Sequence, residues 1–308
     1  MAASPSLLGA AVRHGLVPVA DVRAGRVRVR PVSRSNAVHA VERAGVAVGF
    51  VKQPGTAARL DGDDTAAVEA RILGAIAPLR LAPAPILQGG SGSVWMTALP
   101  GVELAGVVGG AILRPVAIDV GRALARLHRF PVAGSGLPEA ATPWPLLDAL
   151  PVSMEGGRVR PDTRVVLDRL ADPAFRRAVD VARAQWRPTH LVHGDVAAGN
   201  VMVETSPAGG VRIALLDFEL GGLGSPEHDL ASAAAMFAAL SPSGLDLAAL
   251  CLESYWAACG PAELTPAWRC VRAVMTAWQV ALGRGDAGAA EVARLLAVAE
   301  AAAAEVPS

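Results

Sequence analysis

Apolar and polar residues alternate at several places in the first hundred residues, which is the period of half-buried β-strands. The clearest case is residues 26–32, where valines alternate with arginines. Apolar residues take helical spacing only at residues 66–77, after aspartates that are able to cap a helix. This region is therefore expected to form an antiparallel sheet with one helix. Its five strands are expected at residues 26–32, 37–43, 46–53, near 85–87 and 94–97.

The pattern changes after residues 99–101, where proline and glycine interrupt the chain. Beyond this point apolar residues recur mainly at helical spacing, and strands are expected only between Leu191 and Glu219. We therefore divide the chain into domains of residues 1–98 and 99–308. In the second domain, helices are expected at residues 116–128, 162–170, 172–186 and after 229, and a strand hairpin at residues 201–204 and 212–216.

The composition is that of a protein that buries a core but has no strong overall charge. Hydrophobic residues make up 52% of the 308 residues, and 28 basic residues balance 28 acidic ones. This balance gives no attraction to nucleic acid or to an anionic membrane. The first residues make a poor signal peptide, and the apolar run at 104–113 is too short to cross a bilayer. The three cysteines lack CxxC spacing, so reduced thiols in a cytoplasmic protein are expected.

The chain has a single lysine, Lys52, against 27 arginines, and asparagine occurs only at Asn36 and Asn200. Lysine is a compact point charge on a flexible stem, whereas arginine is a wide planar fork, so a tight phosphate pocket distinguishes them. An isolated lysine on a surface would have no such meaning. Because Lys52 ends an apolar strand pattern, we expect it to be retained for phosphate binding.

Oxygen-bearing side chains gather around the predicted hairpin. Asp195 follows a short strand, Asn200 lies where the hairpin begins, and the returning strand leads to Asp217 and Glu219. The hairpin should bring Asn200 and Asp217 together, and strand alternation should put residues 217 and 219 on one side. Amide and carboxylate oxygens suit Mg²⁺, and a further carboxylate is able to orient an acceptor hydroxyl and take its proton. The set therefore matches the needs of phosphoryl transfer.

This part of the chain resembles the aminoglycoside phosphotransferase and choline kinase superfamily, which has the protein-kinase-like fold. The resemblance implies an α+β, bilobal fold. Its small amino-terminal lobe would hold an antiparallel sheet plus one helix, and its larger, mainly helical carboxy-terminal lobe a catalytic β-hairpin. The matching segments are His193-Gly194-Asp195, Asn200, Asp217-Phe218-Glu219, residues 224–231, the helix end at 124–128 and a hinge-like stretch at 97–101.

The resemblance implies roles for single residues. Lys52 would bind the α- and β-phosphates of the nucleotide, and Glu69 would pair with Lys52 and hold it in place. Asp195 would be the catalytic base or the group that orients the hydroxyl. Asn200 and Asp217 would hold magnesium.

Further positions follow from the same resemblance. Backbone groups from Thr97 to Leu99 would meet adenine. Where many kinases carry a Gly-rich loop, this chain has residues 33–36, and Ser35 and Asn36 would bind phosphate there if the segment is more than an ordinary turn.

Other residues near the motif have open or supporting roles. Glu42 and Asp64 compete with Glu69 as the partner of Lys52 by sequence alone. His193 and Asp229 would brace the catalytic loop.

The sequence therefore predicts an ATP- and Mg²⁺-dependent phosphotransferase that acts on an alcohol. Acidic residues are sparse beyond Asp229, which argues against a polycationic or quaternary-amine acceptor. A neutral small molecule remains, as does a peptide serine or threonine, which would require a partner lyase in a natural-product pathway. The alternatives are a non-catalytic pseudokinase that binds nucleotide or acts as a scaffold, and an aminoglycoside O-phosphotransferase. No nucleic-acid or membrane partner is expected.

Overall fold

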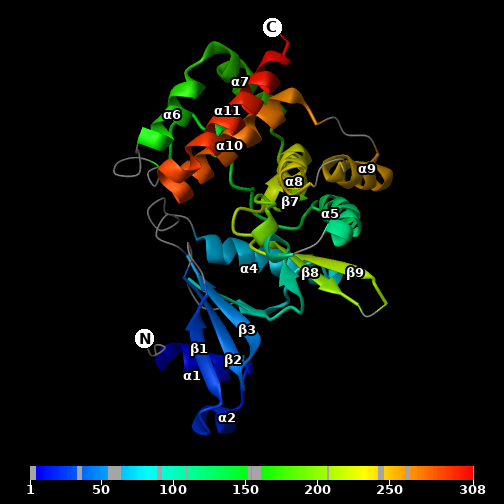
Figure 1. Ribbon diagram of the computed structural model, residues 1–308. Coiled ribbons are helices and arrows are strands. Elements are labelled where there is room, and N and C mark those ends of the chain that lie inside the picture. Colours follow the sequence, from blue (N-terminus) through cyan, green and yellow to red (C-terminus); the bar gives the residue numbers. More distant parts are fainter. Residues whose placement is uncertain are drawn as a thin grey trace.

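The protein has the expected α+β, bilobal protein-kinase-like fold, with a sheet-containing lobe below a helical lobe (Figure 1). No helix in the described part of the chain is long and apolar enough to span a membrane. The computed structural model describes residues 5–32, 37–54, 64–88, 92–107, 110–151, 154, 161–206, 208–241, 246–260 and 264–307.

The amino-terminal lobe is built on a five-stranded antiparallel sheet. The alternation in the first strand puts Val29 into the core at 8% exposure, while the neighbouring arginines face outward. The turn between the second and third strands uses Ala44 and Gly45, both with positive φ (50° and 83°), which suits a tight hairpin. The strands, in sheet order, are β1 (Val27–Pro31), β2 (Ala37–Arg43), β3 (Val46–Gln53), β5 (Val94–Thr97) and β4 (Pro85–Gln88).

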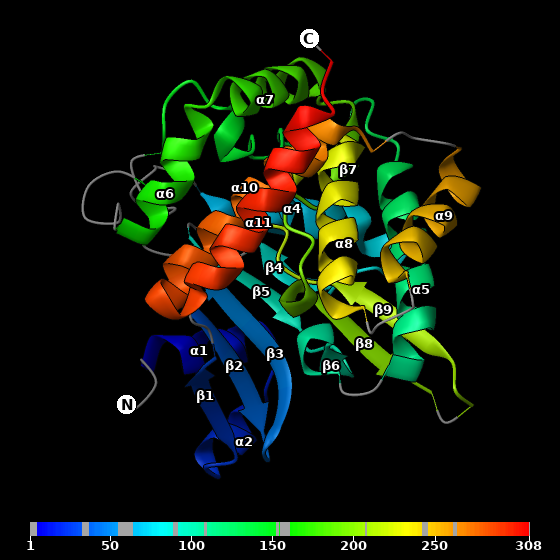
Figure 2. The same ribbon diagram turned by 45° about the horizontal axis from the view of Figure 1, so that its top comes forward.

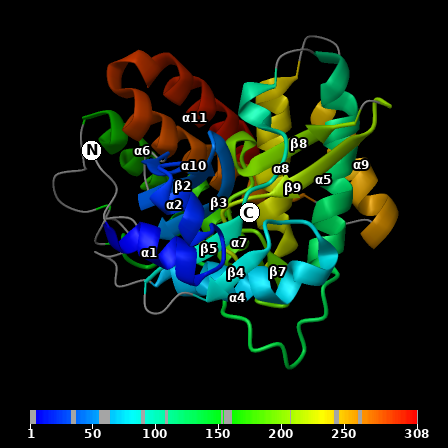
Figure 3. The same ribbon diagram turned by 90° about the horizontal axis from the view of Figure 1, so that it is seen from below.

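The first hundred residues contain more helix than expected. Two helices, α1 (Pro5–Arg13) and α2 (Val19–Arg23), precede the sheet and lie in front of it when seen from below (Figure 3). Ala11 and Val17 pack there in one cluster with sheet residues such as Trp95. Helices this short are marginal alone and depend on packing. The prediction of one helix was wrong because the sheet face that stabilises these helices is not visible in their local pattern.

One helix, α4 (Thr65–Ile76), connects the two lobes. Asp64 caps it by accepting from Ala67 N at 3.1 Å, as the aspartate run predicted. Its Ile72 side chain is fully buried in a core cluster shared with residues of the carboxy-terminal lobe. The helix therefore packs between the sheet and the carboxy-terminal lobe. A short 3₁₀ turn, Ala77–Leu79, follows it.

The carboxy-terminal lobe is mainly helical and carries the expected hairpin, which projects beside α5 (Figure 2). The short strand expected before Asp195 is β7, which pairs with β10. Two short strands, β6 and β10, were not predicted, because two or three residues carry no usable periodicity; β6 pairs with β8. The bounds are β6 (Val102–Glu103), α5 (Leu113–His128), α6 (Pro161–Leu170), α7 (Pro173–Gln185), β7 (His190–Val192), β8 (Val201–Thr205), β9 (Val211–Leu215), β10 (Gly222–Gly224), α8 (Pro226–Leu240), α9 (Leu247–Cys259), α10 (Pro266–Arg284) and α11 (Ala289–Ala304), with 3₁₀ turns at Leu104–Gly106, Gly110–Ile112, Trp144–Leu146, Ala198–Asn200 and Gly285–Gly288.

Candidate active site

Lys52 lies at the centre of a buried cluster of charges between the lobes. The side chain comes from β3 and is only 4% exposed. Its Nζ lies 3.0 Å from Glu69 Oε2 and 3.1 Å from Glu219 Oε2, and it also forms an ion pair with Asp217. A single ammonium from the amino-terminal lobe therefore binds three carboxylates, two of which follow the hairpin of β8 and β9.

These contacts set the charge states of the cluster. Burial alone lowers the pKa of the Lys52 ammonium, but Glu69, Asp217 and Glu219 outweigh burial and raise that pKa above its usual value. Burial also raises the pKa of Glu69, and the charge of Lys52 opposes that rise. Lys52 is therefore held as a cation by its surroundings.

The structure decides among the three acidic residues considered as the partner of Lys52. Glu42 pairs instead with Arg30 on the sheet surface at 3.0 Å, and Asp64 caps α4. Glu69 is 1% exposed, and its second oxygen accepts from Phe218 N at 3.2 Å. Glu69 therefore joins α4, β3 and the segment after β9 in one network.

The reason given for placing Asp217 and Glu219 together was wrong, although both reach Lys52. The expected strand ends at Leu215, and Asp217 has a left-handed backbone with φ of 68°. A turn closed by Gly221 N donating to Phe218 O at 3.0 Å follows. A left-handed residue and a turn, rather than strand alternation, direct both carboxylates toward the lysine.

Asp195 and Asn200 are held together on the loop between β7 and β8. Asn200 Nδ2 donates to the backbone O of Asp195 at 2.9 Å and to its Oδ2 at 3.1 Å. Leu216 N donates to the backbone O of Asn200 at 2.8 Å, which brings the asparagine beside Asp217. The hairpin therefore brings Asn200 and Asp217 near each other, as expected.

A cavity of about 680 Å³ lies between the lobes, and Lys52, Glu69, Asn200 and Asp217 line it; Asp195 is not among its lining residues. Asn200 and Asp217 offer the hard oxygen atoms that suit Mg²⁺, which keeps several waters and needs few protein ligands. The described residues include no cluster of three or more His, Cys, Asp or Glu side chains arranged to hold a metal.

The predicted adenine-contact residues line the same cavity. Thr97 donates its backbone N–H to Ala84 O at 3.0 Å, and its Oγ1 accepts from Ala84 N at 3.1 Å. Its amide is therefore paired with Ala84, whereas its hydroxyl keeps an O–H to donate and its carbonyl is a further candidate contact. Leu99 also lines the cavity. Ser35 and Asn36 lie outside the described residues.

Asp229 stabilises the loop that carries Asp195 through hydrogen bonds to its backbone. Its oxygens accept from His193 N at 2.7 Å and from Gly194 N at 2.9 Å, and Oδ2 lies 3.1 Å from His128 Nε2. Burial would raise the pKa of this carboxyl, but the hydrogen bond from His128 and the nearby histidines lower it to about 2. The hydrogen-bonded chain continues to Tyr255, whose hydroxyl lies 3.0 Å from His128 Nδ1. Sequence reasoning missed Tyr255, because residue spacing does not indicate a contact between α5 and α9.

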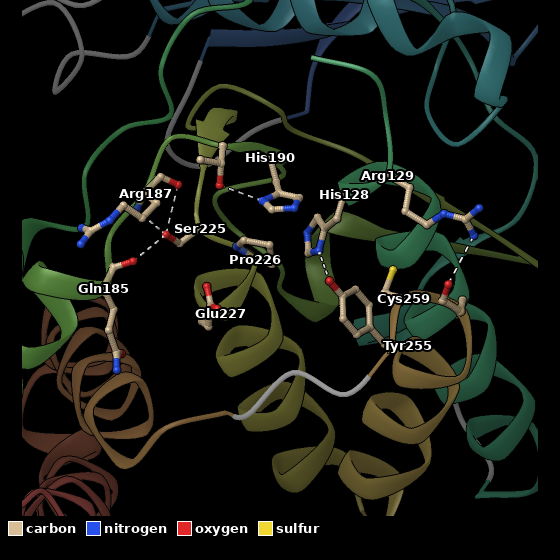
Figure 4. Close-up of a pocket in the computed structure, with 13 residues that line it drawn as sticks. His128, Arg129, Gln185, Arg187, His190, Ser225, Pro226, Glu227, Tyr255 and Cys259 are labelled. Carbon is tan, nitrogen blue, oxygen red and sulfur yellow. Dashed lines mark hydrogen bonds between the residues drawn. The ribbon is translucent and has the colours of Figure 1, made fainter. Parts of the chain in front are cut away.

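A second cavity of about 690 Å³ lies beside His128 and Tyr255 (Figure 4). His128, Tyr255 and the exposed Cys259 line it, together with His190 and Ser225. In Figure 4 the rings of His190 and His128 lie next to each other. Ser225 accepts from Arg187 N at 2.6 Å and so ties the start of α8 to the chain before β7. Nothing in the sequence predicted this cavity.

Comparisons with known proteins identify the family and the fold. The sequence profile described as the Phosphotransferase enzyme family (APH) matches residues 33–274. The comparison with curated proteins gives no significant match.

Solved structures with low sequence identity share the fold. The macrolide 2'-phosphotransferase MphH from Brachybacterium faecium is 21% identical, with 98% of each chain covered and a TM-score of 0.53. The choline kinase LicA from Streptococcus pneumoniae is 14% identical over 94% of this chain and 99% of its own, with a TM-score of 0.62. The GDP complex of aminoglycoside 2'-phosphotransferase-IIIa is 14% identical over 97% and 99%, with a TM-score of 0.57. The profile match spans most of the chain, and so the chain belongs to the phosphotransferase enzyme family.

Proposed function

We propose that this phosphotransferase moves the γ-phosphate of ATP to an alcohol acceptor in a reaction that depends on Mg²⁺. The observation that carries the proposal is the convergence of Lys52, Asn200 and Asp217 on one cavity between the lobes. Phosphoryl transfer needs positioning and charge compensation more than covalent chemistry, and these are the groups that supply both. In this proposal, residues 1–98 are the nucleotide-binding lobe and residues 99–308 the catalytic and acceptor-binding lobe.

Each residue has a distinct task in this proposal. Lys52 binds the nucleotide phosphates, and Glu69 keeps its ammonium in place through the 3.0 Å contact. Asn200 and Asp217 hold Mg²⁺, which would neutralise charge on the phosphates when bound. Asp195 orients the acceptor hydroxyl and takes its proton, and Asn200 holds the carboxylate of Asp195 in position through its amide.

The remaining contacts concern the base and the phosphates. The carbonyl of Thr97 and the backbone of Leu99 meet adenine, since both residues line the cavity. Ser35 and Asn36 are proposed as phosphate contacts on the sequence resemblance alone.

Charge in the helical lobe supports a neutral small-molecule acceptor, or a peptide serine or threonine, over a polycation. Several acidic side chains of this lobe are already paired with arginines, and an aminoglycoside would need free carboxylates. The pairs are Asp168 with Arg164 at 2.9 Å, Asp180 with Arg183 at 3.4 Å, Glu291 with Arg294 at 2.7 Å and Glu300 with Arg169 at 3.9 Å.

The test is phosphate transfer from γ-labelled ATP with Mg²⁺, repeated with GTP and with chelator. The acceptor panel contains neutral polyols, serine and threonine peptides, choline, a macrolide and kanamycin. We expect transfer to a neutral or peptide hydroxyl that is lost with chelator and lowered by roughly 10²–10⁴ in Asp195→Asn. Transfer to kanamycin alone would correct the acceptor class. Nucleotide binding without transfer to any acceptor or to water would favour the pseudokinase alternative.

A further inference from the structure

Three buried side chains form a hydrogen-bonded chain between the second cavity and the loop that carries Asp195. Tyr255, His128 and Asp229 are 3%, 3% and 0% exposed. The Tyr255 hydroxyl lies 3.0 Å from His128 Nδ1, and His128 Nε2 lies 3.1 Å from Asp229 Oδ2. Tyr255 and His128 also line the cavity of about 690 Å³, so the outer end of the chain lies beside this cavity (Figure 4).

The partners of His128 decide which of its ring nitrogens carries the hydrogen. Asp229 is ionised at neutral pH, and an ionised carboxylate only accepts hydrogen bonds. His128 Nε2 therefore donates to Asp229, and in the neutral imidazole this leaves Nδ1 as an acceptor. The Tyr255 hydroxyl then donates to Nδ1. Every contact along the chain thus joins a donor to an acceptor.

The inner end of the chain holds two consecutive amides of the loop. Asp229 Oδ2 accepts from His193 N at 2.7 Å as well as from His128, and Oδ1 accepts from Gly194 N at 2.9 Å. Because the two oxygens belong to one planar group, rotation of the carboxylate would disturb both amide contacts together. The contact with His128 opposes this rotation, and Gly194 directly precedes Asp195.

We propose that Tyr255 is a positioning residue for phosphoryl transfer. Its hydroxyl holds the His128 ring with Nε2–H directed at Asp229, and this contact fixes the carboxylate that sets the backbone before Asp195. Hydrogen bonds in a poorly solvated region strengthen one another, so loss of the outer bond weakens the inner ones. The effect on turnover rests on the proposed role of Asp195, whereas the order of the hydrogen bonds does not.

The first test compares Tyr255→Phe with Cys259→Ala, a change one turn later on α9 in the same cavity. Phenylalanine keeps the buried ring and removes only the hydroxyl. At about pH 8, where histidine is ordinarily neutral, we expect Tyr255→Phe to lower kcat about fivefold, which corresponds to one hydrogen bond. Its KM for Mg·ATP should change less than twofold. Cys259→Ala should match the wild type in both constants.

The second test uses the cavity as a route for a small molecule. His128→Gly removes a ring that lines the cavity, and added imidazole is able to donate to Asp229 and accept from Tyr255 at once. At ten times its Kd, imidazole should raise the Tm of His128→Gly by about 3 °C, and it should raise turnover at least threefold. The analogue 1-methylimidazole has no N–H and should raise neither.

Two further variants complete this test. Imidazole should change neither the Tm nor the turnover of His190→Gly, which removes another ring of the same cavity. In the double variant of His128→Gly with Tyr255→Phe, the Kd of imidazole should rise about fivefold, because the hydroxyl that donates to it is gone. This Kd is measured by the shift in Tm, so it needs no turnover.

Three results would overturn the inference. They are wild-type kcat in Tyr255→Phe, equal rescue of His128→Gly by imidazole and 1-methylimidazole, and loss of folding in both variants. Equal rescue would mean that imidazole only fills space, and loss of folding would assign the chain a structural role. If the wild type transfers phosphate to nothing, the proposed function fails, and the Tm measurements with imidazole still test the order of the hydrogen bonds.

Discussion

Replacing Lys52 with arginine keeps the charge but changes the shape of the cation. An ammonium presents three donors from one atom, whereas a guanidinium presents five from a planar fork. Lys52 is 4% exposed, and its Nζ lies 3.0 Å from Glu69 Oε2 and 3.1 Å from Glu219 Oε2. Forcing a larger group into a filled site costs about 1–3 kcal/mol. For a chain of 308 residues this corresponds to a fall in Tm of about 2–6 °C.

The same change should impair the reaction more than it impairs stability. Displacing a positioned group by about 1 Å is able to cost roughly 10²-fold in rate. We therefore expect Lys52→Arg to lower turnover about 10²-fold and to weaken Mg·ATP binding. The assays are thermal unfolding, calorimetric titration with Mg·ATP and phosphate transfer. The matched control is the reverse change, Arg30→Lys, at the surface pair with Glu42, where we expect no effect.

Two outcomes would refute this reasoning. A wild-type Tm, affinity and turnover in Lys52→Arg would show that the pocket does not distinguish the two cations. A lower Tm with unchanged turnover would mean that Lys52 only stabilises the junction of the lobes.

Three further predictions concern the carboxylates. Glu69→Gln removes a buried charge beside the ammonium, and denaturant titration should show unfolding free energy lower by about 1–3 kcal/mol, whereas the surface change Glu42→Gln should alter it by less than about 0.5 kcal/mol. Asp229 has a folded pKa of about 2 in place of 3.8, so it binds fewer protons in the folded state than in the unfolded state. Its contribution of about 2 kcal/mol to the free energy of unfolding should be complete above about pH 4 and be lost between about pH 4 and pH 2. When unfolding is measured from pH 5 to pH 2, Asp229→Asn should lack this part of the acid dependence. The same loss of stability with acid in Asp229→Asn as in the wild type would contradict the assignment. Asp217→Asn should weaken ATP binding with Mg²⁺ at least tenfold but change binding without Mg²⁺ little, and equal effects in calorimetry under both conditions would remove Asp217 from the metal site.

Local pattern was enough for most of the amino-terminal sheet. The strands β2, β3 and β5 begin and end where the sequence predicted, because turn residues such as glycine and proline lie close to the ends of each run. The helices α1 and α2 escaped prediction, since their stability comes from the sheet face on which they pack.

The candidate site was foreseen in its residue types but not in all its members. The motif around Asp195 predicted Asn200 and Asp217 as neighbours, and the hairpin supplies that proximity. Tyr255 was missed because it reaches Asp229 only through His128, and the two residues lie on helices that are distant in sequence. This contact depends on how α5 and α9 pack, which residue spacing does not record.

The sequence by itself determined the chemistry available to this protein: one ammonium, two neighbouring oxygen donors on a hairpin and a carboxylate on a loop. The tertiary structure decided which groups meet. Glu42, Asp64 and Glu69 were equal candidates along the chain, and only Glu69 reaches Lys52, because α4 packs that face of the helix against the junction of the lobes. Partner choice in a buried cluster depends on distance and desolvation, and both arise only when remote segments pack together.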